Sequence, residues 1–212
     1  MRSLLLLVAL LTALQAGPAR AQSWLVLLVD RSNSIDAAEL RLQREAYVRV
    51  LTDPEVLRAL ADTQVALIEF DTRAELVVPW GSAEEVARRY ARRPPDGLRG
   101  QTAIGAALNK ALGLLQGKQG RLVIDVSGDG PENRDFRLLR KTRAKLDGGG
   151  VLINGLVILN PDEPDLEAFY ETQVANGFVM AIEQQEDFFA ALRRKLLMEM
   201  AVAEAVEQPK WY

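Results

Sequence analysis

The stretch WLVLLVDRSNSID, residues 24–36, decides the fold of this chain. Six apolar residues lead directly into Asp30, and Ser32 and Ser34 follow on alternate positions. A short continuous apolar run is typical of a strand that is covered on both faces, as in a parallel sheet between helices. The sequence therefore predicts a buried strand that delivers one carboxylate and two hydroxyls to its carboxyl end.

The rest of the chain alternates between strand and helix patterns. Asp71-Thr72-Arg73 is short enough for a hairpin turn, and Pro79 places the strand after it at a sheet edge, where a missing N–H is tolerated. Further strands are expected at 64–70, 75–80, 121–126, 151–159 and 178–182. Helices are expected at 36–51, 54–60, between Ser82 and Pro94, and at 104–115, 134–146, 165–174 and 186–206.

This alternation predicts an α/β fold. We expect a doubly wound, Rossmann-like sheet of six strands in the order 3-2-1-4-5-6, mostly parallel, with one antiparallel edge strand and helices on both faces. In such a sheet the crevice opens at the carboxyl ends of strands 1 and 4, where the winding direction reverses. Those two ends are Asp30 and the segment Ser127-Gly128-Asp129-Gly130.

Composition narrows the range of functions. The 212 residues carry a formal net charge of -3 and contain neither cysteine nor histidine. Without histidine there is no Ser-His-Asp triad and no imidazole ligand or base, so any metal must be held by oxygen. A mildly acidic chain is a poor candidate for binding nucleic acid, which favours a basic face.

Residues 1–21 have the features of a cleavable signal peptide. Arg2 precedes an apolar run, Leu4 to Leu14, and Ala19-Arg20-Ala21 has the small-x-small pattern of a cleavage site. The run is too short for a spanning helix, although an uncleaved anchor is the alternative. We expect residues 22–212 to form one domain, secreted or periplasmic, with no membrane span after removal of the leader.

Oxygen-bearing side chains gather at the predicted crevice. Thr102, in GQTAIG, precedes a helix, while Asp30 and Asp129 end strands 1 and 4. Two carboxylates and three hydroxyls form an all-oxygen set that suits a hard divalent cation, above all Mg²⁺, with Mn²⁺ or Ca²⁺ as alternatives. Taken singly, Asp30, Ser34 or Thr102 could be helix N-caps and Asp129-Gly130 a turn.

The segments DRSNS, GQT and SGDG resemble the metal-ion-dependent adhesion site of von Willebrand factor A domains. The resemblance covers essentially all of residues 22–212. It implies that Asp30, Ser32 and Ser34 are ligands from the first loop, Thr102 from the second and Asp129 from the third. The stretches RLVIDVSGDGPEN and RRKLLMEMA are similar to a bacterial secreted subgroup described only as a domain of unknown function.

One departure from the family pattern affects the third loop. The usual hydroxyl-Asp-Gly appears here as Ser127-Gly128-Asp129-Gly130, with an inserted glycine. Asp129 remains the preferred ligand, and Asp125, which falls within the predicted strand, is the second candidate.

The expected function is a metal-dependent binding module rather than an enzyme. A cation held by two carboxylates and neutral hydroxyls would accept a further oxygen, so we expect it to capture an Asp or Glu of a partner protein. The alternatives are a Mg²⁺-dependent phosphohydrolase with Asp30 as nucleophile, and a structural domain with a vestigial site. An EF-hand is excluded because Ile35 and Arg41 stand where its glycine and glutamate are required. The sequence leaves the partner's identity and the oligomeric state open.

Overall fold

The computed structural model describes residues 22–32, 37–93 and 100–206. Six strands form one sheet in the order β3-β2-β1-β4-β5-β6, and β2 and β3 form its antiparallel pair. The other neighbouring strands pair in parallel, which confirms the predicted fold. The strands are β1 (Ser23–Asp30), β2 (Thr63–Phe70), β3 (Ala74–Gly81), β4 (Arg121–Gly128), β5 (Leu152–Ile158) and β6 (Val179–Ile182).

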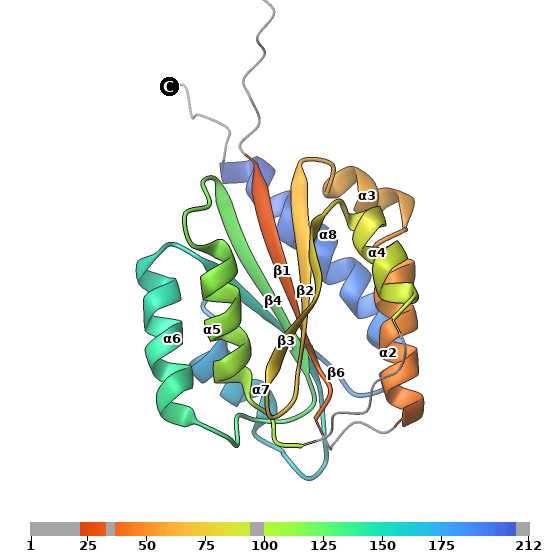
Figure 1. Ribbon diagram of the computed structural model, residues 1–212. Coiled ribbons are helices and arrows are strands. Elements are labelled where there is room, and N and C mark those ends of the chain that lie inside the picture. The colour runs from red at the N-terminus through yellow and green to blue at the C-terminus, as the bar shows by residue number, and fades with distance from the viewer. Residues whose placement is uncertain (1–21, 33–36, 94–99, 207–212) are drawn as a thin grey trace, which may run out of the picture.

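Helices cover both faces of the sheet (Figure 1). One face carries α2 (Ala37–Val50), α3 (Pro54–Ala59), α4 (Ala83–Ala91) and α8 (Phe188–Val206), the last preceded by the 3-10 turn η3 (Gln185–Asp187). The other face carries α5 (Ile104–Leu115), α6 (Phe136–Gly148), α7 (Leu166–Phe169) and the π-helical turn η2 (Tyr170–Val174).

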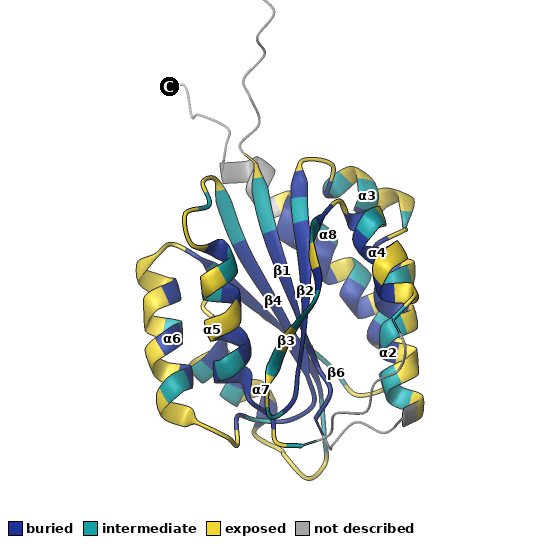
Figure 2. Ribbon diagram, viewed as in Figure 1, coloured by how far each residue is buried: buried dark blue, intermediate teal, exposed yellow. Residues whose placement is uncertain are grey.

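Two hydrophobic cores lie on opposite faces of the sheet, because successive side chains of a strand point to opposite sides. In β1, Leu25 and Leu27 belong to the core under α2 and α8, while Val26 and Leu28 belong to the core under α5 and α6. All four are fully buried. Figure 2 shows the central strands as the most buried part of the molecule, which explains the continuous apolar run in residues 24–29.

The structure differs from the sequence prediction mainly near residue 170. The segment expected to be one helix, 165–174, is a single α-helical turn followed by η2, whose wider turn is closed by the Ala175 N–H donating to the Tyr170 carbonyl at 2.8 Å. Strand β4 also continues to Gly128, beyond the expected end at Val126.

No helix in the described part of the chain has both the length and the apolar character needed to cross a membrane. The predicted signal peptide, residues 1–21, lies outside the described residues.

Candidate metal centre

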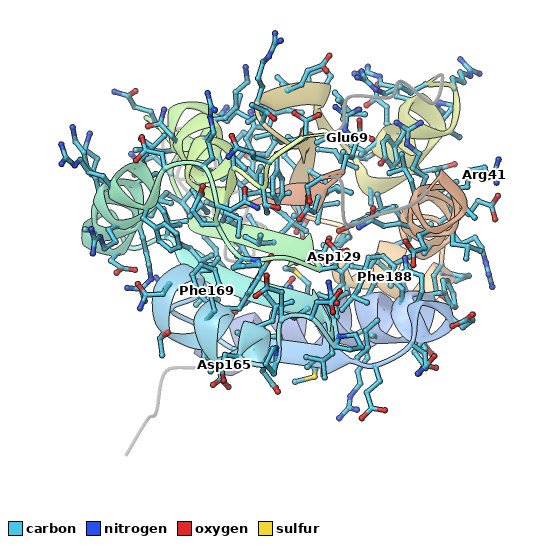
Figure 3. All side chains as sticks on the ribbon, turned by 90° about the horizontal axis from the view of Figure 1, so that it is seen from below. Arg41, Glu69, Asp129, Asp165, Phe169 and Phe188 are labelled. Atoms are coloured by element: carbon cyan, nitrogen blue, oxygen red, sulfur yellow. The ribbon has the colours of Figure 1, made fainter. Side chains whose placement is uncertain are left out.

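Three loops meet at the end of the sheet where the parallel strands have their carboxyl ends. The first loop follows β1 and carries Asp30 and Ser32, the second leads into α5 and carries Thr102, and the third follows β4 and carries Asp129. Figure 3 looks onto this end of the molecule, and Asp129 lies near the middle of it. Ser34, the remaining predicted ligand, lies outside the described residues.

Asp30 is the most deeply placed of these groups, with no exposed surface. Its Oδ1 accepts a hydrogen bond of 2.8 Å from the Ser32 N–H, so the first loop folds back over the end of β1. Within the described residues, no hydrogen-bond donor reaches its Oδ2. Asp30 therefore does not cap α2, which begins at Ala37, and one of its oxygens is left for another partner.

The electrostatic environment of Asp30 is unfavourable to its own charge. Burial, together with the nearby Asp129 carboxylate, raises the pKa of Asp30 from 3.8 to about 8, although hydrogen bonds from Ser32 act in the opposite direction. A buried carboxylate that is close to a second one is stabilised by a cation placed between them. The site thus has the electrostatic character of a cation site.

Thr102 is fastened to the third loop. Its N–H donates to Asn133 Oδ1 at 2.7 Å, and the Asn133 N–H donates back to the Thr102 carbonyl at 3.1 Å. The N-cap of α5 is Ala103, so the alternative in which Thr102 caps this helix is wrong. Thr102 and Asp129 line the same hollow of about 120 Å³.

Glu132 is a further residue of the third loop, and it is not among the site residues predicted from the sequence. It is buried, and its Oε2 accepts from the Gly105 N–H at 2.6 Å. Its Oε1 accepts from the N–H groups of Arg134 and Asp135, both at 2.8 Å. Glu132 therefore ties the third loop to the start of α5, and its only sequence signal is an acidic residue just before a helix.

Arg31, between Asp30 and Ser32, is also buried, and its charge is balanced by two buried acids, Glu69 and Asp71. Its Nη1 lies 2.6 Å from Oε2 of Glu69, the buried acid on β2. Oε1 of Glu69 accepts a hydrogen bond of 2.7 Å from the Tyr90 hydroxyl. The arginine is thus held by β2, and its guanidinium is turned toward Glu69.

Asp125, the second candidate for the third-loop ligand, belongs to another cluster. Its Oδ1 lies 2.5 Å from Lys195 Nζ on α8, and both side chains are fully buried. Since its carboxylate already has a cation from the chain itself, Asp125 is a structural residue of β4, as the sequence analysis favoured.

The predicted ligand groups at this end of the sheet are carboxylates and hydroxyls. Among the described residues, no three acidic, histidine or cysteine side chains come together as a metal-binding group. A site built from Asp30, Asp129, Ser32 and Thr102 has two carboxylates only, which is compatible with that finding. Such a donor set fits a hard dication that keeps some water or accepts an outside oxygen.

Comparison with solved structures supports the fold. Proximal thread matrix protein 1 from the mussel byssus superimposes with a TM-score of 0.64 at 18% identity, over 85% of this chain and 47% of that one. This chain thus spans about half the length of the byssus protein, which was also solved with a zinc-occupied MIDAS motif.

Two bacterial proteins have the same fold. The PilB minor pilin of Streptococcus sanguinis, as its D319A mutant, gives a TM-score of 0.73 at 12% identity, over 92% of this chain and 65% of that one. An aerotolerance-related membrane protein from Bacteroides fragilis gives 0.62 at 20% identity, over 82% of this chain and 98% of that one. At these identities the likeness establishes a von Willebrand factor A-like fold.

A search of the curated proteins found no match. The family model described as "Protein of unknown function (DUF1194)" matches residues 20–204. The chain belongs to this DUF1194 family.

Proposed function

We propose that this protein is a divalent-metal-dependent binding module, which captures an acidic residue of a partner protein through a bound Mg²⁺. The observation that carries the proposal is the Asp30 carboxylate, fully buried with no donor to its Oδ2 among the described residues. A buried ionised carboxylate needs a neutralising partner, and a dication at the end of the sheet would provide one.

The ligands would come from all three loops. Asp30 and Asp129 would supply carboxylate oxygens, Ser32 and Thr102 hydroxyls, and Ser34 joins the set by resemblance to the adhesion-site motif. Oxygen donors favour Mg²⁺, with Mn²⁺ and Ca²⁺ as alternatives. The zinc-occupied MIDAS motif of the byssus protein supports a dication at this place in the fold.

A bound dication would supply a Lewis-acidic centre for an external carboxylate. The two aspartates would balance the charge of the metal, and the neutral hydroxyls would leave it able to accept another oxygen. Asp129 borders two hollows, of about 120 Å³ and about 180 Å³, so space for an incoming side chain exists beside it. These features support capture of an Asp or Glu from another protein.

Binding is favoured over phosphohydrolysis by the burial of Asp30. A carboxylate that attacks phosphorus must itself be reached by the substrate, whereas Asp30 has no exposed surface and would need to contact only the ion. We therefore expect no metal-dependent release of phosphate from a generic aryl phosphate, measured at millimolar Mg²⁺. Release that disappears in Asp30→Ala would establish the enzymatic alternative instead.

The place of action would be outside the cytoplasm. This part of the proposal rests on the predicted signal peptide, and it is tested by the N-terminal sequence of the protein isolated from its source. A mature protein that begins near Gln22 is expected.

Metal binding is tested by thermal unfolding with Mg²⁺, with Mn²⁺ and with EDTA. A ligand that binds only the native state adds about 2.7 kcal/mol at a hundredfold excess over Kd, so a clear rise in Tm is expected for the wild type. Asp30→Ala should lose this rise. The matched control is Asp125→Asn, a buried acid of the neighbouring strand, which should keep the full metal-induced rise even though its baseline Tm is lower. No rise in the wild type would refute the metal site and favour a vestigial one.

Partner capture is tested with the immobilised protein and an extracellular fraction of the source organism. Binding should require Mg²⁺ or Mn²⁺, release should follow addition of EDTA, and carbodiimide blocking of the partner's carboxyl groups should abolish it. Binding that persists after blocking would show that the metal does not grip a carboxylate.

A further inference from the structure

The phenol of Tyr170 reaches the candidate metal centre from a part of the chain that the adhesion-site motif does not include. Tyr170 opens the π-helical turn η2 and is fully buried. Its ring lies over Gly155 of β5, and its hydroxyl donates to the Gly130 carbonyl at 3.3 Å. Gly130 directly follows Asp129, so this contact holds the third loop beside its predicted ligand.

Gly128 leaves the space that the phenol occupies. A Cβ at this position would lie 2.6 Å from the Tyr170 hydroxyl oxygen and 2.8 Å from Asp30 Oδ2. Real Cβ contacts are essentially never that short, so a side chain here would force the phenol or the carboxylate to move. The inserted glycine of the third loop therefore makes room for two particular groups. These are the Tyr170 hydroxyl and Asp30 Oδ2, the oxygen that no donor reaches among the described residues.

The register of the sheet explains why these groups meet. Ser127 pairs with Val29, so the next residues along the two parallel strands, Gly128 and Asp30, lie side by side. Asp30 and Asp129 also act on the phenol, because burial first and then these two carboxylates raise the pKa of Tyr170 well above 10.0. The phenol is therefore a neutral donor close to both predicted carboxylate ligands.

We propose that Tyr170 is a positioning residue of the metal centre, and that residue 128 is a glycine because a side chain there would occupy the space of the Tyr170 hydroxyl. Resting on the proposed function, this inference adds a fourth element, η2, to the three loops of the adhesion-site motif. Tyr170 holds the third loop through its hydrogen bond to the Gly130 carbonyl, and its hydroxyl packs next to Gly128, beside Asp30 Oδ2. The π-helical turn sets the direction of the phenol, in keeping with the frequent occurrence of such turns at functional sites.

Titration with Mn²⁺, followed by the electron paramagnetic resonance signal of the free ion, tests the role of Tyr170. Loss of an outer-shell partner typically weakens metal binding 10- to 100-fold, and for Tyr170→Phe we expect the lower end, about tenfold. The matched control is Tyr90→Phe, which also removes one buried hydroxyl, here a donor to Glu69, and should change the Mn²⁺ affinity less than twofold. If Tyr170 had only a structural role, Tyr170→Phe and Tyr90→Phe would lower the affinity for Mn²⁺ by the same factor.

The outcomes separate this inference from the proposed function. A wild-type protein that does not bind Mn²⁺ refutes the metal site and the inference with it. A wild type that binds Mn²⁺, together with an unchanged affinity in Tyr170→Phe or an equal loss in Tyr90→Phe, overturns the inference alone.

A second pair of variants tests the match between glycine and phenol. Gly128→Ala should weaken Mn²⁺ binding more than Tyr170→Phe does, because the new methyl group displaces both the phenol and Asp30. In the double variant the conflict with the hydroxyl is removed, so its affinity should be no lower than that of Gly128→Ala alone. If the loss of Mn²⁺ affinity in the double variant equals the product of the losses in the two single variants, Gly128 and Tyr170 act independently. That result would overturn the proposal that Gly128 makes room for the phenol.

Discussion

Two fully buried aspartates stand on neighbouring strands of the sheet and have opposite surroundings. Asp125, in the middle of β4, lies 2.5 Å from Lys195 Nζ, which also lies 2.8 Å from Glu199 Oε1. Asp30, at the end of β1, receives the Ser32 N–H on one oxygen and no donor on the other among the described residues. The chain thus supplies a cation for the internal acid, whereas Oδ2 of the acid at the sheet end has no hydrogen-bond donor among the described residues.

The cluster of Lys195, Asp125 and Glu199 contains a cation of the chain itself. Burial alone would lower the pKa of Lys195, but Asp125 and Glu199 outweigh it and raise the pKa above 10.5. Asn154 Nδ2 adds a hydrogen bond of 2.7 Å to Glu199 Oε1. This cluster anchors α8 to β4 and β5 with one lysine between two acids, and burial raises the pKa of the second acid, Glu199, to about 7.

The largest expected effect is at the internal cluster. Lys195→Met would leave two buried acids without their cation, and breaking a buried ion pair in this way typically costs about 3–5 kcal/mol. We expect a loss of that size in the free energy of unfolding, measured by urea denaturation. Metal should not restore it, because the cluster is sealed inside the molecule.

Arg193→Met, on the same helix, is the matched control for this prediction. Arg193 pairs with Asp53 at 3.0 Å, with 32% of its own side-chain surface exposed, so its replacement should cost far less stability than that of Lys195. If Lys195→Met and Arg193→Met lost the same free energy of unfolding, the burial of Lys195 would add nothing to the strength of its ion pairs. The contrast between Asp125 and Asp30 would then have no physical basis.

An intermediate effect is expected at Asp30, with the opposite dependence on metal. In EDTA, Asp30→Asn should be as stable as the wild type or more stable, because a carboxylate that is costly to ionise has been replaced by a neutral isostere. At a hundredfold excess of Mg²⁺ over Kd, the wild type should gain about 2.7 kcal/mol and the variant nothing. Urea midpoints in the two buffers measure both effects, and a variant less stable than the wild type in EDTA would contradict this account of Asp30.

The sequence was sufficient to predict the strand order of the sheet and to place three loops at one end of it. Apolar runs such as residues 24–29 mark buried parallel strands, and Pro79 marks the edge strand, because both signals are local. Asp30, Thr102 and Asp129 could be placed together because the winding of such a sheet brings these loops to one end.

The contacts that support the site could not be predicted in the same way. Tyr170 lies 40 residues from Gly130, and nothing in the residues near it marks a π-helical turn or shows which way the phenol points. Lys195 and Asp125 are likewise far apart in the chain, so the lysine in a largely apolar helix gives no indication of its partner. In both cases the partners are chosen by tertiary packing, which local patterns do not encode.

The smallest expected effect extends the comparison to the surface. Asp53 caps α3 and pairs with Arg193 of α8, and the Arg193 hydrogen bond is the main reason that the pKa of Asp53 is lowered from 3.8. A lowered pKa stabilises the fold when the pH is above the pKa of the unfolded chain, and ceases to do so as the pH falls through the pKa of the folded protein.

Asp53→Asn keeps a good N-cap but loses the charge, so we expect a fall in Tm of about 1–2 °C at pH 7. That difference should shrink as the pH falls below 3.8 and vanish once the pH is below the lowered pKa of folded Asp53, because protonated aspartate and asparagine then carry the same charge. Thermal scans of both proteins at the two pH values measure it, and a difference that persists at low pH would show that the cap, rather than the ion pair, is responsible.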